Sequence, residues 1–175
     1  MSRAYIGIGS NLGDRQSHLQ RAVTLLHSPP EIRVLRASSL YETEPVDVGG
    51  DWFFNGVVEI ETSLPPHALL EVLLRVEEAC GRPREREKGA ARVLDLDLLL
   101  YEDRVLEEPH LQLPHPRMHL RRFVLAPLAE LQPDLIHPRL GISVTELLAR
   151  LPVVPQVRPI LQDWMPAQVL GAYAQ

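Results

Sequence analysis

Residues 93–101 constrain the fold more than any other segment, because aspartate and leucine alternate along them. Successive side chains of a strand point to opposite faces of a sheet, so Asp95 and Asp97 share one face and the neighbouring leucines share the other. A leucine face of this kind has to be buried by helices. The segment therefore predicts a strand in a sheet with one covered face and one face that carries two carboxylates.

The other apolar segments give the order of elements around this strand. Strands are expected at three further places: residues 3–9, 32–41 and 55–62. A helix is expected over about 14–27, capped by Asp14, with Leu19, Ala22, Val23 and Leu26 on one face. A second helix is expected over about 63–80, followed by Gly81. The order β-α-β-β-α-β predicts an α+β fold, a ferredoxin-like sandwich with an antiparallel sheet. Helical turns near 116–131 and 143–151 would add a C-terminal helical part.

Length and composition are those of one globular domain. The chain has 175 residues, of which 45% are hydrophobic and 23% are charged. We expect residues 1–155 to form the domain and 156–175 a tail whose role the sequence does not indicate. The first residues are too short an apolar run for a signal peptide, and no apolar run could span a membrane. The expectation is a cytoplasmic, monomeric protein with no membrane partner.

Several chemistries are excluded or disfavoured. The net charge of −5 disfavours nucleic acid as a partner. Cys80 is the only cysteine, so no intrachain disulfide can form. The P-loop pattern is absent, and the glycines of residues 7–13 are interpreted as a tight turn.

The paired carboxylates are the strongest chemical signal. Their Cα atoms would lie roughly 6–7 Å apart, and like charges at that distance repel by roughly 3 kcal/mol. Solvent, a bound cation or a retained proton must offset this repulsion. Hard oxygen ligands suit Mg²⁺, whereas the alternative interpretation is a solvated sheet face or an edge protected by charge.

Basic residues flank the acidic strand on both sides. Residues 82–92 contain four arginines and Lys88, and residues 115–122 contain three arginines and two histidines without any acidic residue. Each segment alone is typical of a solvated loop. Arginines beside paired carboxylates are also what a Mg²⁺-nucleotide polyphosphate requires.

Aromatic residues are scarce, at 5% of the chain, yet three of them follow one another at 52–54, directly before Asn55. We expect them in a loop. A planar heterocycle could stack on such rings, with Phe123 on its other side, while the Asn55 amide binds its edge. The alternative is that Phe53 or Phe54 enters the core.

These residues resemble those of a known family. The sequence Arg92-Val-Leu-Asp95-Leu-Asp97-Leu-Leu, preceded by Lys88-Gly-Ala-Ala91, is similar to the signature of 6-hydroxymethyl-7,8-dihydropterin pyrophosphokinase, a folate-pathway enzyme. Further segments match in order and spacing: Tyr5 to Gly13, Ser38 to Thr43, Phe54-Asn55, Gly81-Arg82, and Pro114-His115 through Phe123 to Leu128. The resemblance covers roughly residues 3–150.

The resemblance implies that pyrophosphate is transferred from ATP to the hydroxymethyl group of 6-hydroxymethyl-7,8-dihydropterin and that AMP is released. It implies two Mg²⁺ ions held by Asp95 and Asp97. The implied catalytic residues are Arg82, Arg92 and Asp97. The implied ATP-binding residues are Glu77, Arg84, Arg92, Leu98, His115 and Arg121. The implied pterin-binding residues are Thr43, Val46, Phe53, Asn55 and Phe123.

Two segments depart from the family pattern, and several alternatives stay open. Gly89-Ala90-Ala91 stands where the family often has Trp-Gly-Pro, and Pro116 stands where a tyrosine often follows His115. Glu77 is equally typical of an exposed helix surface. The alternative functions are another Mg²⁺-dependent nucleotidyl- or phosphotransferase and a non-enzymatic ferredoxin-like ligand-binding module. Release of AMP only in the presence of the pterin and Mg²⁺ would distinguish them.

Overall fold

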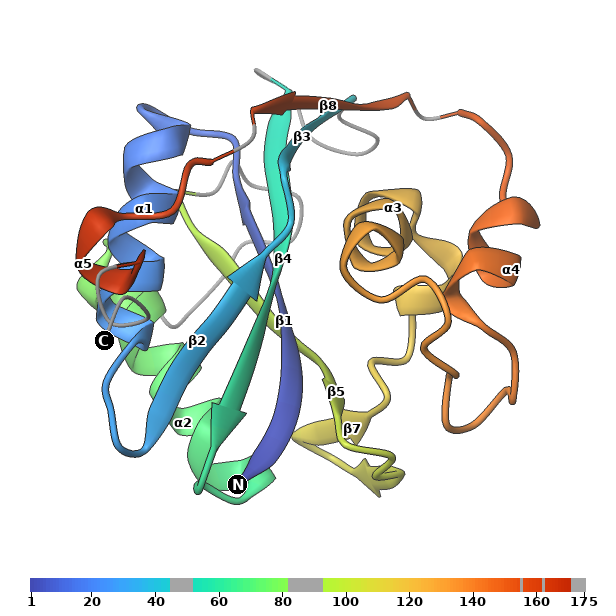
Figure 1. Ribbon diagram of the computed structural model, residues 1–175, viewed down its shortest axis with the longest axis horizontal. Coiled ribbons are helices and arrows are strands. Elements are labelled where there is room, and N and C mark those ends of the chain that lie inside the picture. Colours follow the sequence, from blue (N-terminus) through green and yellow to red (C-terminus); the bar gives the residue numbers. More distant parts are fainter. Residues whose placement is uncertain (45–51, 82–92, 155, 162, 171–175) are drawn as a thin grey trace.

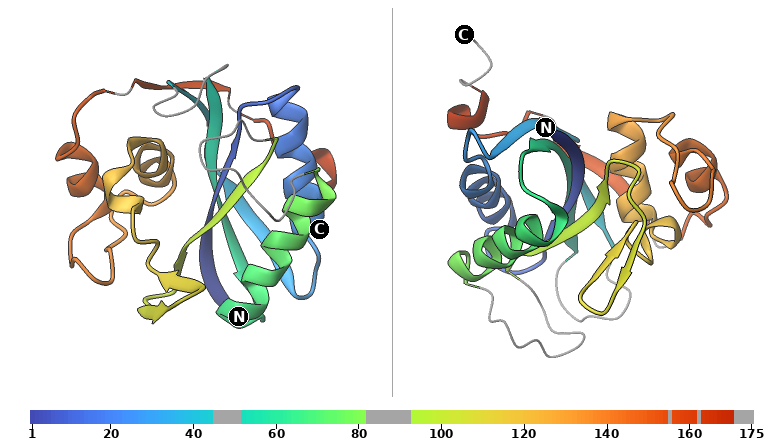
Figure 2. Two further views of the ribbon diagram at one scale, coloured as in Figure 1. Left: turned by 180° about the vertical axis from the view of Figure 1, so that it is seen from behind. Right: turned by 90° about the horizontal axis from the view of Figure 1, so that it is seen from below.

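A computed structural model of the chain describes residues 1–44, 52–81, 93–154, 156–161 and 163–170. Helices cover both faces of a central sheet (Figure 1; Figure 2). On one face lie α1 (Arg15–Leu26), α2 (Pro66–Ala79) and the short α5 (Ala167–Leu170). On the other lie the 3-10 helix η1 (Met118–Leu120), α3 (Arg122–Leu131) and α4 (Val144–Ala149). None of the described helices is long and apolar enough to cross a bilayer.

Six strands form the sheet within the described residues: β1 (Ser2–Ser10), β2 (Ile32–Ala37), β3 (Leu40–Thr43), β4 (Phe53–Thr62), β5 (Asp95–Tyr101) and β8 (Val157–Leu161). Their order is β5-β1-β4-β3-β8, and β2 pairs with the second half of β4. All these pairings are antiparallel. A separate hairpin consists of β6 (Leu106–Glu108) and β7 (Leu111–Leu113). The predicted mixture of helices and an antiparallel sheet is confirmed.

The helix-side core fills the space between the sheet and α1 and α2. The Asp14 carboxylate accepts a hydrogen bond from the Ser17 amide, which begins α1 at the predicted residue. The buried face of α1 is the predicted one: Leu19, Ala22, Val23 and Leu26. The alternating leucines in and directly before β5 are also buried in this core, as predicted: Leu94, Leu96 and Leu98. Each such side chain contributes about 1.5–3 kcal/mol of burial free energy.

A second apolar cluster covers only one end of the opposite face, which we call the site face. Tyr5, Val57 and Leu99 of the sheet pack there against α3 and α4. A register shift between β1 and β5 adds Leu100 to the same cluster. The other end of this face carries polar residues and glycine, so it is the part that is open to chemistry.

Three sequence-based expectations are wrong in detail. Residues 32–41 form two strands, because the Ser38 hydroxyl accepts a hydrogen bond from the Val57 amide and interrupts the ladder between them. Phe53 and Phe54 begin β4 and do not lie in a loop, because they pair with β3. Gly7 and Gly9 lie inside β1, and the turn that follows uses the left-handed conformation of Gly13.

Residues 156–170, in their described part, join the fold. β8 pairs with the outer side of β3, and the chain then crosses the end of the sheet to place α5 beside α1 (Figure 1). Trp164 is buried, and its indole N–H donates to the Ser38 carbonyl at 2.7 Å. The segment set apart as a tail therefore supplies a strand and a buried tryptophan.

Candidate functional site

The centre of the site face is a row of three residues from three strands. Gly9 of β1 pairs with Asp95 of β5 on one side and with Asn55 of β4 on the other. Directly opposed residues of antiparallel strands share a face, so the carboxylate and the amide both lie on the site face. Glycine at position 9 places no side chain between them. Two residues along the same three strands and on the same face, Gly7 separates Asp97 from Val57 in the same way.

The predicted pterin residues on β3 and β4 lie together. Asn55 is buried and donates from its amide nitrogen to the Thr43 hydroxyl at 2.9 Å. Thr43 pairs with Phe53 in the ladder, so Phe53 lies on the same face as the amide. The neighbouring Phe54 packs against the helix-side core instead. Phe54 is thus the ring that enters the core, and stacking on a heterocycle stays a prediction for Phe53.

Phe123 and Arg121 approach from the beginning of α3. The Arg121 guanidinium carbon lies 5.5 Å from the centre of the Phe123 ring, a cation–π distance. The far end of α3 is held to the sheet by Glu130, which accepts from the Ser39 amide at 2.5 Å and from the Tyr41 hydroxyl at 2.9 Å. Burial and this carboxylate raise the pKa of Tyr41. Glu130 therefore holds the C-terminal end of α3 against β3 and the residue before it.

His115 is the best-defined member of the basic segment. Its backbone amide donates to the Leu99 carbonyl at 2.8 Å, and its Nδ1 accepts from the Arg117 amide at 3.1 Å. Burial, and after it the guanidinium groups of Arg121 and Arg117, lower its pKa to about 4, against the opposing effect of the Asp95 carboxylate. The imidazole is thus neutral at pH 7. These interactions also bring the second basic segment beside the acidic strand.

Asp95 and Asp97 are half-buried and offer only hard oxygen ligands. Among the described residues, no group of three or more histidine, cysteine, aspartate or glutamate side chains could hold a metal ion. This donor set fits Mg²⁺, which keeps several waters and is usually bound by one or two carboxylates together with substrate phosphates.

Glu77 lies in the last turn of α2 and is only 3% exposed, so the interpretation as an exposed helix glutamate is wrong. Its Oε2 accepts a hydrogen bond from the Leu96 amide at 2.9 Å. This bond ties the outermost strand β5 to α2, directly between the two aspartates. The Leu98 side chain packs in the helix-side core, so a contact from Leu98 to nucleotide would use its backbone.

Four predicted site residues lie outside the described residues: Val46, Arg82, Arg84 and Arg92. Their roles stay predictions. The sequence interpretation missed the two glycines of β1 and the pair formed by Tyr41 and Glu130. Glycines two residues apart in a strand are a recognisable signal, because both remove side chains from the same face.

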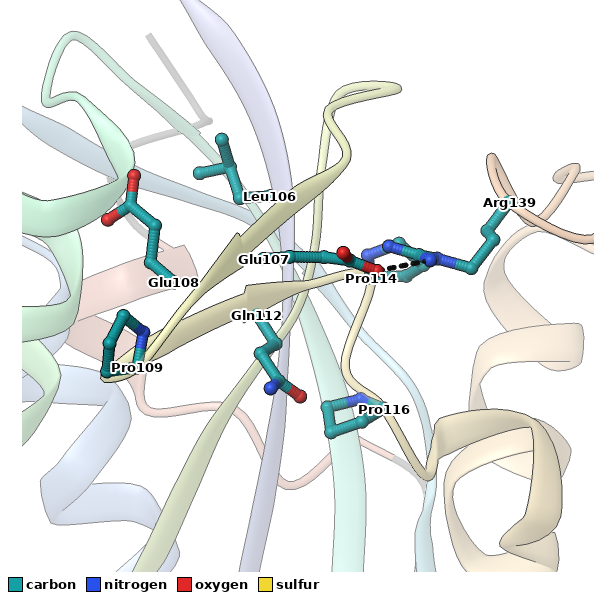
Figure 3. A pocket seen from close by; sticks show the side chains of 8 residues that line it. All are labelled: Leu106, Glu107, Glu108, Pro109, Gln112, Pro114, Pro116 and Arg139. Atoms are coloured by element: carbon teal, nitrogen blue, oxygen red, sulfur yellow. Dashed lines mark ion pairs between the residues drawn. The ribbon is translucent and has the colours of Figure 1, made fainter.

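A pocket of about 510 Å³ lies elsewhere, under the β6–β7 hairpin (Figure 3). Its rim includes an ion pair of 2.5 Å between Glu107 and Arg139. The other lining residues are Leu106, Glu108, Pro109, Gln112, Pro114 and Pro116. None of the predicted site residues lines it, although its two last prolines flank His115. The pocket is therefore separate from the row of Asp95, Gly9 and Asn55.

A mixed α/β domain that sets paired carboxylates, a basic segment and an amide among aromatic rings on one sheet face defines a phosphoryl-transferring enzyme. Residues 5–133 match the family model of 7,8-dihydro-6-hydroxymethylpterin-pyrophosphokinase (HPPK), and the chain belongs to this family.

Two curated relatives are similar in sequence to this chain over most of their own length. The chain is 49% identical over 152 residues to a 2-amino-4-hydroxy-6-hydroxymethyldihydropteridine pyrophosphokinase of Methylorubrum extorquens, a match that covers 86% of this chain and 94% of the relative. It is 49% identical over 129 residues to the enzyme of the same name from Bacillus subtilis, covering 73% of this chain and 77% of the relative.

Solved structures share the fold. A crystal structure of Plasmodium falciparum HPPK-DHPS with SDX-DHP superposes with a TM-score of 0.67 at 17% identity and covers 85% of this chain. The wild-type protein with pteroate gives a TM-score of 0.69 at 14% identity. This chain spans only 43% and 44% of those two chains.

Proposed function

We propose that this protein transfers the pyrophosphoryl group of ATP to the hydroxymethyl group of 6-hydroxymethyl-7,8-dihydropterin, releasing AMP. Its relatives carry the name of this activity. One structural observation supports it above all: Asp95, Gly9 and Asn55 form a row on one face, which joins the proposed metal-binding end to the proposed heterocycle-binding end.

We propose that the core is ferredoxin-like. The segment from β1 to β5 runs β-α-β-β-α-β when β2 and β3 are taken as one interrupted strand. The last of these strands and the third both flank the first, in antiparallel pairs. This order supports the ferredoxin-like arrangement over other α+β sandwiches.

The pterin would bind between the rings of Phe53 and Phe123. The Asn55 amide, oriented by Thr43, is the group suited to the mixed donors and acceptors along a pterin edge. Val46 would add a backbone contact. Water would be displaced from both faces of the ring, which favours stacking.

The triphosphate would lie toward β5. Asp95 and Asp97 would hold two Mg²⁺ ions, which supply charge neutralisation of phosphate oxygens when bound. Arg121 donates hydrogen bonds to phosphate, and the neutral His115 can donate one through its Nε2. Arg82, Arg84 and Arg92 would complete the anion site, while Glu77 holds β5 in place from beneath.

The reaction forms one bond and breaks one. The hydroxymethyl oxygen attacks the β-phosphorus of ATP, and the bond from that phosphorus to the α,β-bridging oxygen breaks, so AMP leaves with the bridging oxygen. The hydroxyl proton is also lost, and Asp97 is a candidate to accept it. Catalysis rests mainly on positioning and charge stabilisation. Because ATP is the co-substrate, we propose that the enzyme is cytoplasmic, and we propose separately that it is a monomer.

The test is a product analysis with purified protein, Mg²⁺ and ATP, with and without 6-hydroxymethyl-7,8-dihydropterin. We expect AMP and the pterin diphosphate in equal amounts, and no AMP when the pterin or Mg²⁺ is omitted. Formation of ADP, release of free pyrophosphate, or AMP formed without the pterin would overturn the proposal and favour another phosphotransferase.

A further inference from the structure

The strand β8 lies against the end of the sheet that carries the proposed pterin residues. The Glu44 amide, directly after β3, donates to the Gln156 carbonyl at 3.1 Å, and β8 then pairs with β3 as far as Leu40. The family match ends at residue 133, so this strand lies beyond it.

Arg158 of β8 makes two contacts across that end of the sheet. Its guanidinium binds the Glu42 carboxylate of β3, with the nearest nitrogen at 2.9 Å. The same guanidinium carbon lies 5.1 Å from the centre of the Trp52 ring. The carbonyl of Trp52 also accepts a hydrogen bond from the guanidinium of Arg15, which stacks on the Phe54 ring. Arg158 thus joins the residue before β4 to β3.

Each residue that Arg158 contacts is adjacent in the chain to a predicted pterin residue. Glu42 precedes Thr43, and Trp52 precedes Phe53. Thr43 and Phe53 face each other across β3 and β4, while Glu42 pairs with Phe54 and so lies on the opposite face. The contacts of Arg158 with Glu42 and Trp52 therefore hold, from the opposite face, the backbone that presents Thr43 and Phe53 to the site.

We propose that Arg158 is a positioning residue for the pterin, acting through Trp52 and Glu42. This inference rests on the proposed function. Loss of the Arg158 side chain would leave the phosphate end of the site intact, since β5 and β8 lie at opposite ends of the strand order. A pterin-specific effect is the consequence.

The first experiment compares Arg158→Ala and Arg158→Lys with the unmodified enzyme. Arg158→Ala should raise the KM for the pterin about 3- to 10-fold, with kcat and the KM for ATP within about twofold. Arg158→Lys keeps the charge beside Glu42 but loses the planar stack, so it should recover part of the loss. Arg150→Ala removes an arginine that is as exposed as Arg158 and is paired with Glu146 on α4, so it is the matched control and should change neither KM.

The second experiment is a double-mutant cycle with Trp52→Ala. If Arg158 acts through Trp52, then Arg158→Ala should add less to the KM for the pterin in the Trp52→Ala background than alone. Fully additive effects, equal changes in both KM values, or a fall in kcat alone would overturn the inference. If Arg158→Ala unfolds more readily, a pterin titration of Arg158→Lys that does not rely on tryptophan fluorescence still tests the inference. Pterin binding equal to that of the wild type would refute a role for the stacking of Arg158 on Trp52. Absence of AMP release by the unmodified enzyme would instead refute the proposed function.

Discussion

A β-carbon at Gly9 would lie 2.7 Å from the side-chain oxygen of Asn55. Real contacts of this kind do not occur, so one of the two atoms would have to move. The obstacle is the end of a side chain and not a backbone atom, and the Asn55 amide can therefore swing away. The requirement for glycine at position 9 thus belongs to the site more than to the fold.

Gly9→Ala should raise the KM for the pterin about tenfold, because the displaced Asn55 amide loses its hydrogen bond to Thr43 and its orientation. Steady-state kinetics with varied pterin would measure this. Gly7→Ala is the matched control for folding, since its new β-carbon would meet Leu99 at an ordinary 3.5 Å. An unchanged pterin KM in Gly9→Ala would show that Asn55 does not bind the pterin.

Asp97→Ala should lower kcat at least about a thousandfold, because it removes a proposed Mg²⁺ ligand next to the reacting phosphorus. A second measurement does not depend on turnover. Mg²⁺ with a non-hydrolysable ATP analogue should raise the unfolding temperature of the wild type, and this increase should be lost in the variant. Asp103→Ala, an exposed carboxylate in the turn after β5, should keep both properties. A retained thermal shift in Asp97→Ala would contradict the metal assignment.

Glu77→Ala should lower the free energy of unfolding by about 1–3 kcal/mol, because the buried Leu96 amide loses its acceptor. It should also lower kcat, since β5 carries both aspartates. Glu77→Gln keeps a carbonyl acceptor and should restore most of the stability. Urea unfolding would measure the difference, with the exposed Glu71→Ala on the same helix as control. Equal stability of Glu77→Ala and Glu71→Ala would count against the bond.

Local patterns predicted the parts of this molecule that depend on neighbours in the chain. The alternation along 93–101 and the buried face of α1 follow from strand and helix periodicity alone, and both are confirmed. The break between β2 and β3 could not be predicted in the same way. It depends on the hydrogen bond from Val57 to Ser38, residues 19 positions apart in the chain.

The site shows the same division. The sequence predicts which residues carry the chemistry, a prediction that the experiments above test, but it does not indicate which of them lie together. Glu77 resembled a surface glutamate because its partner is a backbone amide on another element, which leaves no trace in side-chain patterns. The pairing of β8 with β3 joins residues more than a hundred positions apart, and no local signal specifies it.

The low pKa of His115 predicts a specific loss of stability in acid. Burial and two arginines lower it to about 4, against 6.5 for an ordinary histidine. Between pH 6.5 and 4 the unfolded chain therefore binds a proton at this histidine while the folded chain does not. The free energy of unfolding consequently decreases as the pH falls through this window. The stability that is lost in acid through His115 is fully present above pH 6.5 and amounts to no more than about 3 kcal/mol.

His115→Asn keeps an acceptor for the Arg117 amide but cannot be protonated, so it isolates this effect from other histidines such as His27 and His137, whose pKa values are also lowered. Urea unfolding of both proteins in Mg²⁺-free buffer from pH 8 to 4 would measure it. The wild type should lose more stability than the variant below pH 6.5, and the two should differ by a constant amount above pH 7. Parallel curves over the whole range would mean that His115 is protonated as readily in the folded chain as in the unfolded one, and that Arg121 and Arg117 do not surround it.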